Sequence, residues 1–533
     1  MSSAANDTVQ SLLRGRLGDD GIAVKYDDRK WSWREHLSAA SSVAAALLAV
    51  LDRMRPPHIG LLLANSPQMV VQLAAAGLGG YVVCGINTTR RGSALLADIR
   101  RADCQILITD AAHRHLLTGA DLTGIRLFDT STAEWQQLVA GGLPLVPYRE
   151  VTALDTFMMI FTSGTGGNPK AVRVSHFMVA MSGRALTDQF SLSPADTCYV
   201  SMPLFHSNAI VAGWSVAINS GAAMAPARFS ASHFLTDIRR YSATYMNYVG
   251  KPLAYILDTP ARPDDADNPL RVAFGNEAGD HDIDEFGRRF DVEVVDGFGS
   301  TENAVIVTRE PGTPTGSIGR GFPGVAVYNS ETITECAAAT FDSTGALNNA
   351  DQAVGELVNT AGTGFFTGYY NDEHATAERL RHGIYWSGDL AYRDADGWIY
   401  LAGRTADWMR VDGENIAAAP IERILIRCSA VSRVAVYAVR GADGFDQVVA
   451  ALDLRTDATL TPAEFAAFLS AQPDLSPTSW PRYVRLTHDF PVTATHKVVK
   501  RELIAQGVSP GSGVLWVREP RGTTYSPSRT GSN

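Results

Sequence analysis

Short apolar segments alternate with helical runs through the first 310 residues of this 533-residue chain. In the first series, the segments 58–63 and 105–109 are apolar and short enough to be strands. A second series begins near residue 155, with helices expected near 176–188 and 232–241. Strands that alternate with helices of about 10–15 residues are typical of βαβ units, so the pattern predicts an α/β fold with parallel sheet. Further strands of the second series are expected at 243–249, 271–274 and 292–295.

After Gly312 the chain changes to many turns and short strands, a pattern that predicts an antiparallel β subdomain. From about residue 407 a compact α+β pattern follows, and the tail at 511–533 ends in a run of Ser, Thr, Gly and Arg that we expect to be disordered. In these two regions we expect strands at 325–328, 355–358, 398–401 and 434–439, and helices near 418–427 and 462–470.

The segment 161–175 concentrates hydroxyl groups and glycines between an apolar run and an alternating one. Glycines let the backbone approach a ligand closely, and successive N–H groups in such a turn form a nest for anions. The segment is not a Walker A loop, because Pro169 precedes the lysine and Ala171 follows it. It therefore indicates either an ordinary loop or a polyphosphate site of another kind. Its candidate ligands are Thr162, Ser163, Gly164, Thr165, Gly166, Gly167 and Lys170.

A second candidate segment, 296–302, follows the expected strand 292–295. Ligands in open α/β sheets gather at the carboxyl ends of the strands. A carboxylate such as Glu302 beside a polyphosphate is a natural Mg²⁺ ligand, and an aromatic such as Phe298 can stack on a base. The alternative is a turn that ends a strand and exposes an acid.

Three further residues are candidates downstream. Asp389 could accept both hydroxyls of a ribose, and the guanidinium of Arg404 could bind phosphate or hydroxyl oxygens. Lys497 lies in a segment near the carboxyl terminus, where a lysine could neutralise charge on a reacting carboxylate and phosphate. Two Asp-Gly pairs, 396–397 and 412–413, are interpreted as turns. The GxGxxG match at 319–324 lacks a following helix and carries no weight.

Charge and composition narrow the class of protein. A net charge of −10 and a pI near 5.7 argue against a general nucleic-acid binder. Five scattered cysteines without a CxxC pair suit a reducing compartment and give no zinc-site spacing. No secretory signal precedes the first helix, and the apolar run 37–51 is too short to span a membrane. We expect a cytoplasmic protein with no nucleic-acid partner, at most peripheral membrane contact, and a possible homodimeric state.

These segments, in this order and spacing, resemble the acyl/aryl-adenylate-forming superfamily, which includes acyl-CoA synthetases, adenylation domains of peptide synthetases and firefly-type luciferases. The likeness covers residues 20–505. Within the superfamily the chain is most similar to actinobacterial FadD-type fatty-acyl-CoA synthetases, nearest to those linked to sterol side-chain degradation. The segments 203–208, 248–251, 275–277 and 297–302 favour that branch.

The resemblance implies a large N-terminal ATP- and acyl-binding domain over 1–403, with βαβ sheets flanked by helices and a β subdomain. A hinge follows at 404–407, and then a small mobile α+β domain over 408–510 that carries the catalytic Lys497. The resemblance also implies an acid–thiol ligase. With Mg²⁺ as cofactor and ATP and CoA as co-substrates, the enzyme would activate a medium- or long-chain fatty acid through acyl-AMP. The alternatives are a ligase for a steroid side-chain carboxylate, or a fatty-acyl-AMP ligase that loads a carrier protein.

The resemblance assigns roles residue by residue. Thr165 and Glu302 would serve Mg²⁺, His206 would lie near the acyl carboxylate as a gate, and Lys497 would support adenylation. Trp214, Tyr248 and Val249 are candidate walls of the acyl pocket, with plain core as the alternative. Four departures from the family pattern stand out: Gly166 in place of a threonine, Ala171 in place of a glycine, Ala406 at the hinge, and His496 in place of the glycine before Lys497. The residues implied to contact ATP are Thr162, Ser163, Gly164, Thr165, Gly166, Gly167, Lys170, Gly275, Asn276, Glu277, Phe298, Gly299, Ser300, Thr301, Asp389, Arg404 and Lys497.

Overall fold

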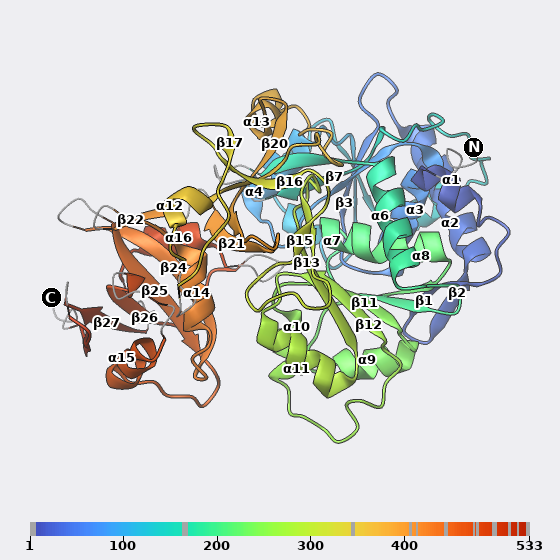
Figure 1. The fold of residues 1–533 in the computed structure, drawn as a ribbon. Helices are drawn as coiled ribbons and strands as arrows, with labels where there is room; N and C mark the ends of the chain where they lie inside the picture. Colours follow the sequence, from blue (N-terminus) through green and yellow to red (C-terminus); the bar gives the residue numbers. More distant parts are fainter. Residues whose placement is uncertain are drawn as a thin grey trace. The chain divides into compact units, whose positions relative to one another are not determined.

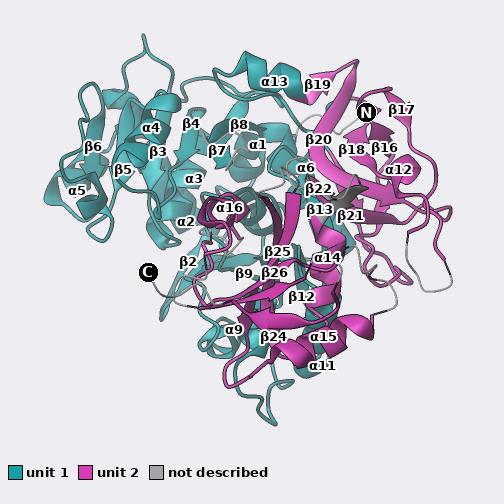
Figure 2. Ribbon diagram, turned by 90° about the vertical axis from the view of Figure 1, so that its left-hand side faces the viewer, with its two compact units in different colours: residues 1–304, 363–378 teal, residues 305–362, 379–533 magenta. Residues whose placement is uncertain are grey.

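The protein divides into two compact units, which are described separately (Figure 2). The first unit comprises Met1–Ala304 and Thr363–Glu378, and the second comprises Val305–Gly362 and Arg379–Asn533. The coordinates are a computed structural model. The residues it describes are 7–162, 169–342, 347–404, 408–411, 414–441, 446–472, 475, 479–492, 498–509, 513–519 and 522–528.

Two largely parallel sheets form the first unit (Figure 1). One has the order β6-β5-β3-β4-β7-β8, in which β8 alone runs antiparallel to its neighbour. Its strands are β3 (His58–Leu62), β4 (Val82–Gly85), β5 (Ile106–Thr109), β6 (Arg126–Asp129), β7 (Thr156–Thr162) and β8 (Lys170–Ser175). The other runs β13-β12-β11-β9-β10-β1-β2 within this unit, with β2 antiparallel. Its strands are β1 (Ile22–Tyr26), β2 (Arg29–Ser32), β9 (Thr197–Val200), β10 (Ala223–Pro226), β11 (Tyr245–Val249), β12 (Val272–Asn276) and β13 (Glu293–Gly299).

Helices join these strands, and local sequence explains where several of them begin. Ser32 and Glu35 form a capping box at the start of α2, and Ser66 caps α3, which has a proline in its first turn. The π-helical turn η3 separates α7 from α8. The helices are α1 (Val9–Arg14), α2 (Trp33–Val50), α3 (Pro67–Gly79), α4 (Gly92–Arg101), η2 (Arg114–Leu117), α5 (Ala133–Val139), α6 (His176–Gln189), α7 (Ser207–Ala209), η3 (Ile210–Trp214), α8 (Ser215–Ser220), α9 (Phe234–Tyr241), α10 (Pro252–Leu257), α11 (Asp280–Phe290) and α13 (Glu373–Arg379).

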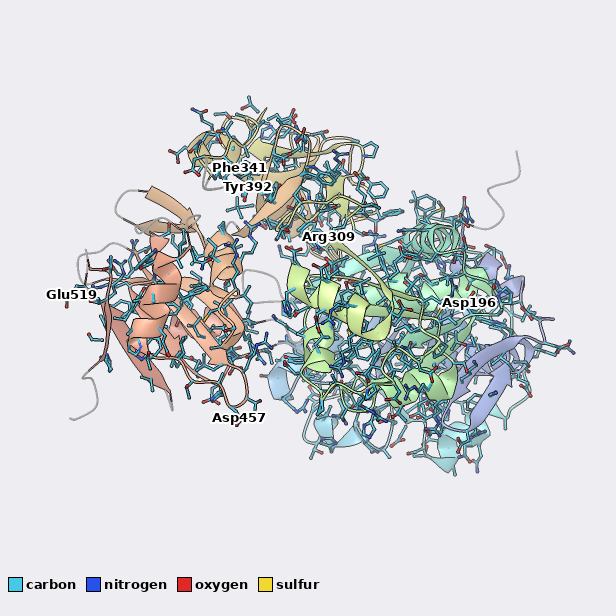
Figure 3. All side chains as sticks on the ribbon, turned by 60° about the horizontal axis from the view of Figure 1, so that its bottom comes forward. Asp196, Arg309, Phe341, Tyr392, Asp457 and Glu519 are labelled. Carbon is cyan, nitrogen blue, oxygen red and sulfur yellow. The ribbon has the colours of Figure 1, made fainter. Side chains whose placement is uncertain are left out.

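A buried carboxylate ties together the amino ends of three parallel strands. Asp196, labelled in Figure 3, directly precedes β9 and accepts hydrogen bonds of 2.8 Å from Thr244 Oγ1 and Arg271 Nη2. Thr244 precedes β11 and Arg271 precedes β12. One carboxylate therefore connects the amino ends of β9, β11 and β12. The opposite edge, where the strands have their carboxyl ends, is left for ligands.

The second unit contains an antiparallel sheet and a smaller α+β part. The sheet has the order β17-β16-β18-β20-β19, with β21 also paired to β20. Within this sheet, Tyr392 stacks on its cross-strand partner Tyr400 at 5.1 Å, and Phe341 packs edge-on against both; Phe341 and Tyr392 are labelled in Figure 3. The elements up to β21 are β14 (Ile306–Thr308), β15 (Arg320–Gly321), β16 (Val325–Asn329), β17 (Thr334–Glu335), α12 (Ala350–Ala353), β18 (Gly355–Asn359), β19 (Leu380–Arg381), β20 (Ile384–Arg393) and β21 (Ile399–Arg404).

In the α+β part the hairpin β22–β23 is followed by a sheet of order β24-β25-β26-β27-β28. Its core includes Ile421, Phe465 and Trp516. The elements are β22 (Trp408–Val411), β23 (Glu414–Ala417), α14 (Ala418–Leu425), β24 (Val431–Arg440), β25 (Asp446–Leu454), α15 (Pro462–Ser470), β26 (Tyr483–Leu486), α16 (Lys500–Gln506), β27 (Val514–Arg518) and β28 (Tyr525–Pro527).

The structure confirms the predicted α/β class, and each expected helix and strand is present within a few residues of its expected bounds. The expectation of a disordered tail at 511–533 is wrong for its described part, because β27 and β28 lie there. Trp516 and Tyr525 bury their rings in the neighbouring core, and this apolar burial orders a stretch whose polar composition suggested disorder. The boundaries 1–403, 404–407 and 408–510 stay predictions, and 405–407 lie outside the described residues. No helix of the described chain is long and apolar enough to cross a membrane.

Candidate active site

The hydroxyl- and glycine-rich segment connects β7 to β8. These strands pair antiparallel, and the register sets Thr162 opposite Lys170. The two ends of the connection are therefore held side by side at the carboxyl end of β7, where the sheet offers a ligand site. The residues between them, Ser163, Gly164, Thr165, Gly166 and Gly167, lie outside the described part of the chain, so their expected phosphate contacts stay predictions.

Tyr369 connects two of the predicted site residues. Its hydroxyl donates a 2.6 Å hydrogen bond to Oε1 of Glu302, whose side chain is buried. Its ring lies 5.1 Å from the ammonium nitrogen of Lys170. Lys170 also lies 3.5 Å from Oε2 of Glu378, which is largely exposed. The structure thus brings the expected phosphate-binding lysine and the expected metal-binding carboxylate into contact with one aromatic side chain, the lysine at its ring face and the carboxylate at its hydroxyl.

The expected adenine-binding segments lie at the carboxyl ends of neighbouring parallel strands. In the register of β12 and β13, Gly275 is opposite Asp296 and Asn276 is opposite Gly297. The Asn276 amide donates a 3.4 Å hydrogen bond to the Gly299 carbonyl. Three further expected contacts of this edge lie in or directly after these strand ends: Glu277 is exposed, and Phe298 and Ser300 are partly exposed.

Gly275 has a steric reason to be glycine. A Cβ atom at this position would meet the Tyr248 carbonyl oxygen at 2.4 Å and the Tyr248 ring at 2.6 Å. The Tyr248 hydroxyl in turn donates to Asp296 at 2.9 Å, which links β11 to β13 across the strand that lies between them. The close approach of the three strands therefore depends on the missing side chain.

The segment with the expected gate residue adjoins the Glu302 segment. The Ser207 hydroxyl lies 3.3 Å from that of Thr301, so His206 is brought near the residue that precedes Glu302. The loop before His206 is held by Asn65, whose side chain accepts a hydrogen bond from the Leu204 N–H at 2.9 Å. The π-turn η3 follows directly, and such turns are frequent at functional sites.

Two of the three expected acyl-pocket residues are completely buried by protein. Trp214, in η3, stacks on Phe157 with centroids 5.4 Å apart and planes 4° apart. Tyr248 is fully buried and hydrogen-bonded to Asp296, as described above, while Val249 retains 7% exposure. These contacts fit a core role, and whether the three residues also contact an acyl chain stays a prediction.

The expected ribose-binding pair belongs to the second unit. The register of β20 and β21 places Asp389 directly opposite Arg404, as a hairpin around the Asp396-Gly397 turn requires. The family resemblance also implies that Arg404 lies close to Asp389, and the main-chain register agrees. Lys497 and the Asp412-Gly413 pair lie outside the described residues.

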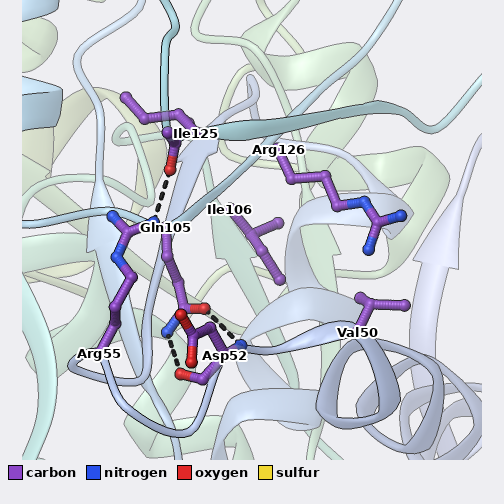
Figure 4. Close-up of a pocket in the computed structure, with 8 residues that line it drawn as sticks. Val50, Asp52, Arg55, Gln105, Ile106, Ile125 and Arg126 are labelled. Atoms are coloured by element: carbon purple, nitrogen blue, oxygen red, sulfur yellow. Dashed lines mark hydrogen bonds between the residues drawn. The ribbon is translucent and has the colours of Figure 1, made fainter.

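A cavity of about 350 Å³ lies away from all these residues, in the first unit (Figure 4). Ile106 and Arg126 on its wall begin β5 and β6, so it lies at the amino ends of these strands. The Gln105 side chain beside it already bonds both main-chain groups of Asp52. Since the expected phosphate loop lies at the opposite edge of the same sheet, this cavity is separate from the candidate site.

Sequence reasoning missed Tyr369, Glu378 and Asn65. The side chains of Tyr369 and Glu378 contact predicted residues, whereas Asn65 holds the loop before His206, and none of the three lies in a motif with a chemical signature. The only signal near Tyr369 is the pair of tyrosines that follows Gly368, which is equally typical of a packed loop.

Candidate ligands at the carboxyl ends of parallel strands are typical of α/β enzymes in general, and comparison with known proteins identifies the class as adenylate-forming. The chain belongs to the AMP-binding enzyme family, whose model matches residues 15–370. It is 48% identical to the medium/long-chain-fatty-acid–CoA ligase FadD17 of Mycobacterium marinum, over 97% of this chain and 99% of the relative. It is 43% identical to the steroid-22-oyl-CoA synthetase of Rhodococcus jostii, over 94% of this chain and 91% of the relative.

Solved structures share the fold. ATP-bound MatB from Rhodopseudomonas palustris superimposes with a TM-score of 0.82 at 22% identity, over 94% of this chain and 99% of MatB. The anthranilate CoA ligase AuaEII in complex with anthranoyl-AMP also gives 0.82, at 19% identity, over 93% of this chain and 96% of that one.

Proposed function

We propose that this protein is an ATP-dependent fatty-acyl-CoA ligase. The observation that supports this most directly is the 48% identity to a medium/long-chain-fatty-acid–CoA ligase over almost the full length of both chains. At such identity and coverage the relative and this chain share the whole architecture. This includes the residues of the first unit at 162–302 and those of the second unit at 389–497 that carry the candidate ATP ligands.

The proposed reaction has two steps. A carboxylate oxygen of the acid attacks the α-phosphorus of ATP, the bond to the β-phosphate oxygen breaks, and pyrophosphate leaves. The thiol of CoA then attacks the acyl carbonyl of the acyl-AMP, AMP leaves, and the thiol proton passes to solvent. Neither step requires a protein nucleophile, so the residues act by positioning the reactants and stabilising charge.

The residues of the first unit fit Mg²⁺ bound with ATP. Mg²⁺ is usually held by one or two carboxylates together with phosphate oxygens, rather than by a cage of protein ligands. Glu302 provides one such carboxylate, and its hydrogen bond from Tyr369 holds one of its oxygens in place. Thr165 is the second proposed ligand. The bound ion would neutralise the charge of the leaving pyrophosphate.

The other assignments are proposals of the same kind. Thr162 to Lys170 bind the β- and γ-phosphates, and Asp389 with Arg404 binds the ribose. Lys497 stabilises the charge that develops during adenylation, and His206 lies at the acyl carboxylate. Rotation about 404–407 would replace the adenylation arrangement by one that admits CoA.

A steroid side-chain carboxylate is the second candidate substrate, supported by the 43% identity to a steroid-22-oyl-CoA synthetase. The two candidates can be separated by incubating the protein with ATP, Mg²⁺ and CoA and an equimolar mixture of fatty and steroid acids. Mass spectrometry then identifies which acyl-CoA forms first. Fatty acyl-CoA as the main product supports the first proposal, and a steroid thioester supports the second. Acyl-AMP that persists in the presence of CoA contradicts both and favours transfer to a carrier protein.

A further inference from the structure

Tyr369 is a buried side chain that contacts two groups of opposite charge. It is 5% exposed, and it contacts Glu302 through its hydroxyl and Lys170 through its ring face. The residue lies 67 positions after Glu302 in the chain, in the segment that returns to the first unit. The functional importance of this tyrosine depends on what each contact does.

The hydroxyl contact orients the carboxylate. A length of 2.6 Å falls in the range of a hydrogen bond from a hydroxyl to an ionised oxygen, which is roughly twice as strong as a neutral one. Within the described part of the chain, the Glu302 carboxylate makes no other hydrogen bond or ion pair. Tyr369 therefore holds Oε1 in place. Because the carboxylate is a rigid planar group, this also sets the direction of Oε2.

The ring contact orients the lysine. An ammonium group within about 6 Å of an aromatic centroid is attracted to the negative face of the ring. The other partner of Lys170 is Glu378, whose side chain is 57% exposed, and ion pairs with exposed partners contribute little. The ring is consequently the more rigid of the two supports for the Lys170 ammonium.

Tyr369 is itself held from three sides. Its main chain forms an isolated bridge with Val172 of β8, and its N–H donates to Thr376 Oγ1 at 3.0 Å. Its ring packs edge-on against Phe366 at 5.0 Å. A side chain held in this way can restrict the positions of both charged groups that it contacts.

We propose that Tyr369 is a positioning residue of the adenylation step, which sets Glu302 for Mg²⁺ and Lys170 for the ATP phosphates at the same time. This inference rests on the proposed function. It assigns two separable tasks to one side chain: the hydroxyl serves the metal, and the ring serves the phosphate-binding lysine.

Two substitutions separate these tasks. Tyr369→Phe removes the hydroxyl and keeps the ring, whereas Tyr369→Leu removes both. Tyr370→Phe is the matched control, because the Tyr370 hydroxyl donates to Asp103 at 2.9 Å instead of to Glu302. For each full-length variant, the rate of pyrophosphate exchange into ATP is measured with a fatty acid present. In one series the Mg²⁺ concentration is varied at saturating ATP, and in the other the ATP concentration is varied at saturating Mg²⁺.

For Tyr369→Phe we expect the Mg²⁺ concentration at half-maximal rate to rise about tenfold, as befits loss of one hydrogen bond to a charged group, with the KM for ATP unchanged. For Tyr369→Leu both values should rise, and for Tyr370→Phe neither should change. A purely structural role would lower the fraction of active protein and leave both concentrations as they are in the wild type.

An unchanged Mg²⁺ dependence in Tyr369→Phe, or an equal shift in Tyr370→Phe, would overturn the inference. Should Tyr369→Phe fail to fold, Thr376→Val takes its place. It removes the acceptor of the Tyr369 N–H, and we expect a smaller shift of the same sign; no shift would again contradict the inference. Absence of exchange in the wild-type protein would instead refute the proposed function itself.

Discussion

Two buried histidines should make the stability of the first unit depend on pH. His36 in α2 and His176 at the start of α6 are 3% and 1% exposed. Burial disfavours the charged imidazolium, and it lowers the pKa of each from 6.5 to about 4. Among the described residues, His36 Nε2 and His176 Nδ1 find no hydrogen-bond partner that would oppose this effect.

The direction of the effect follows from the lowered pKa values. Above about pH 6.5 both histidines are neutral in the folded and unfolded protein, and they do not affect the stability. As the pH falls from 6.5 toward 4, the unfolded chain binds protons that the folded chain excludes, so the free energy of unfolding decreases. At pH 5 the difference amounts to roughly 2 kcal/mol for each histidine, or about 4 kcal/mol together.

Urea unfolding at pH 7.5 and pH 5.0 measures this loss, followed by a probe that reports on the first unit. His176→Gln should reduce the difference between the two pH values by about half. The control is His281→Gln, because the His281 side chain is 78% exposed and should leave the difference unchanged. Equal pH dependence in the wild type and in His176→Gln would refute the assignment of a buried neutral imidazole.

The remaining predictions concern the proposed reaction. Lys497→Ala should lose adenylation yet still form the thioester from supplied acyl-AMP; equal loss of both steps in single-turnover assays would contradict its assigned role. Glu302→Gln keeps an oxygen that can accept the hydrogen bond from Tyr369 but removes the negative charge that is proposed to bind Mg²⁺. The rate of pyrophosphate release should therefore fall by about 100-fold or more, with an unchanged melting temperature. Gly275→Ala should lower the melting temperature and weaken ATP binding, since its Cβ would overlap the Tyr248 carbonyl; calorimetry that shows wild-type values for both would disprove the steric reasoning.

The elements of the fold were largely predictable because their signals are local. The start of α2 depends on Ser32 and Glu35, three residues apart, and the end of α3 on Gly80, which adopts a left-handed conformation. Apolar runs of the right length marked β3, β5 and β12 within a residue or two. The prediction for the tail was wrong because its order comes from the packing of Trp516 and Tyr525 against residues far away in the sequence, such as Phe465, which composition alone does not show.

In the candidate site, too, some features could be predicted from the sequence and others could not. The residue types that bind phosphate, metal and ribose were recognisable in the sequence, because the chemistry of each ligand demands particular groups. Tyr369 was not recognisable, since a pair of tyrosines after a glycine is equally typical of a packed loop. Its importance arises only where the segment 363–378 returns to pair with β8.

By itself, the sequence determined which side chains are available for adenylate chemistry and which strands and helices carry them, because hydrogen bonding and side-chain periodicity act over a few residues. The tertiary structure decided which of these groups meet. The antiparallel register set Thr162 opposite Lys170 and Asp389 opposite Arg404, and a hydrogen bond across 67 positions joined Tyr369 to Glu302. The two strand registers follow from turns between consecutive strands, whereas the contact of Tyr369 with Glu302 depends on the return of segment 363–378 to the first unit, which no local pattern encodes.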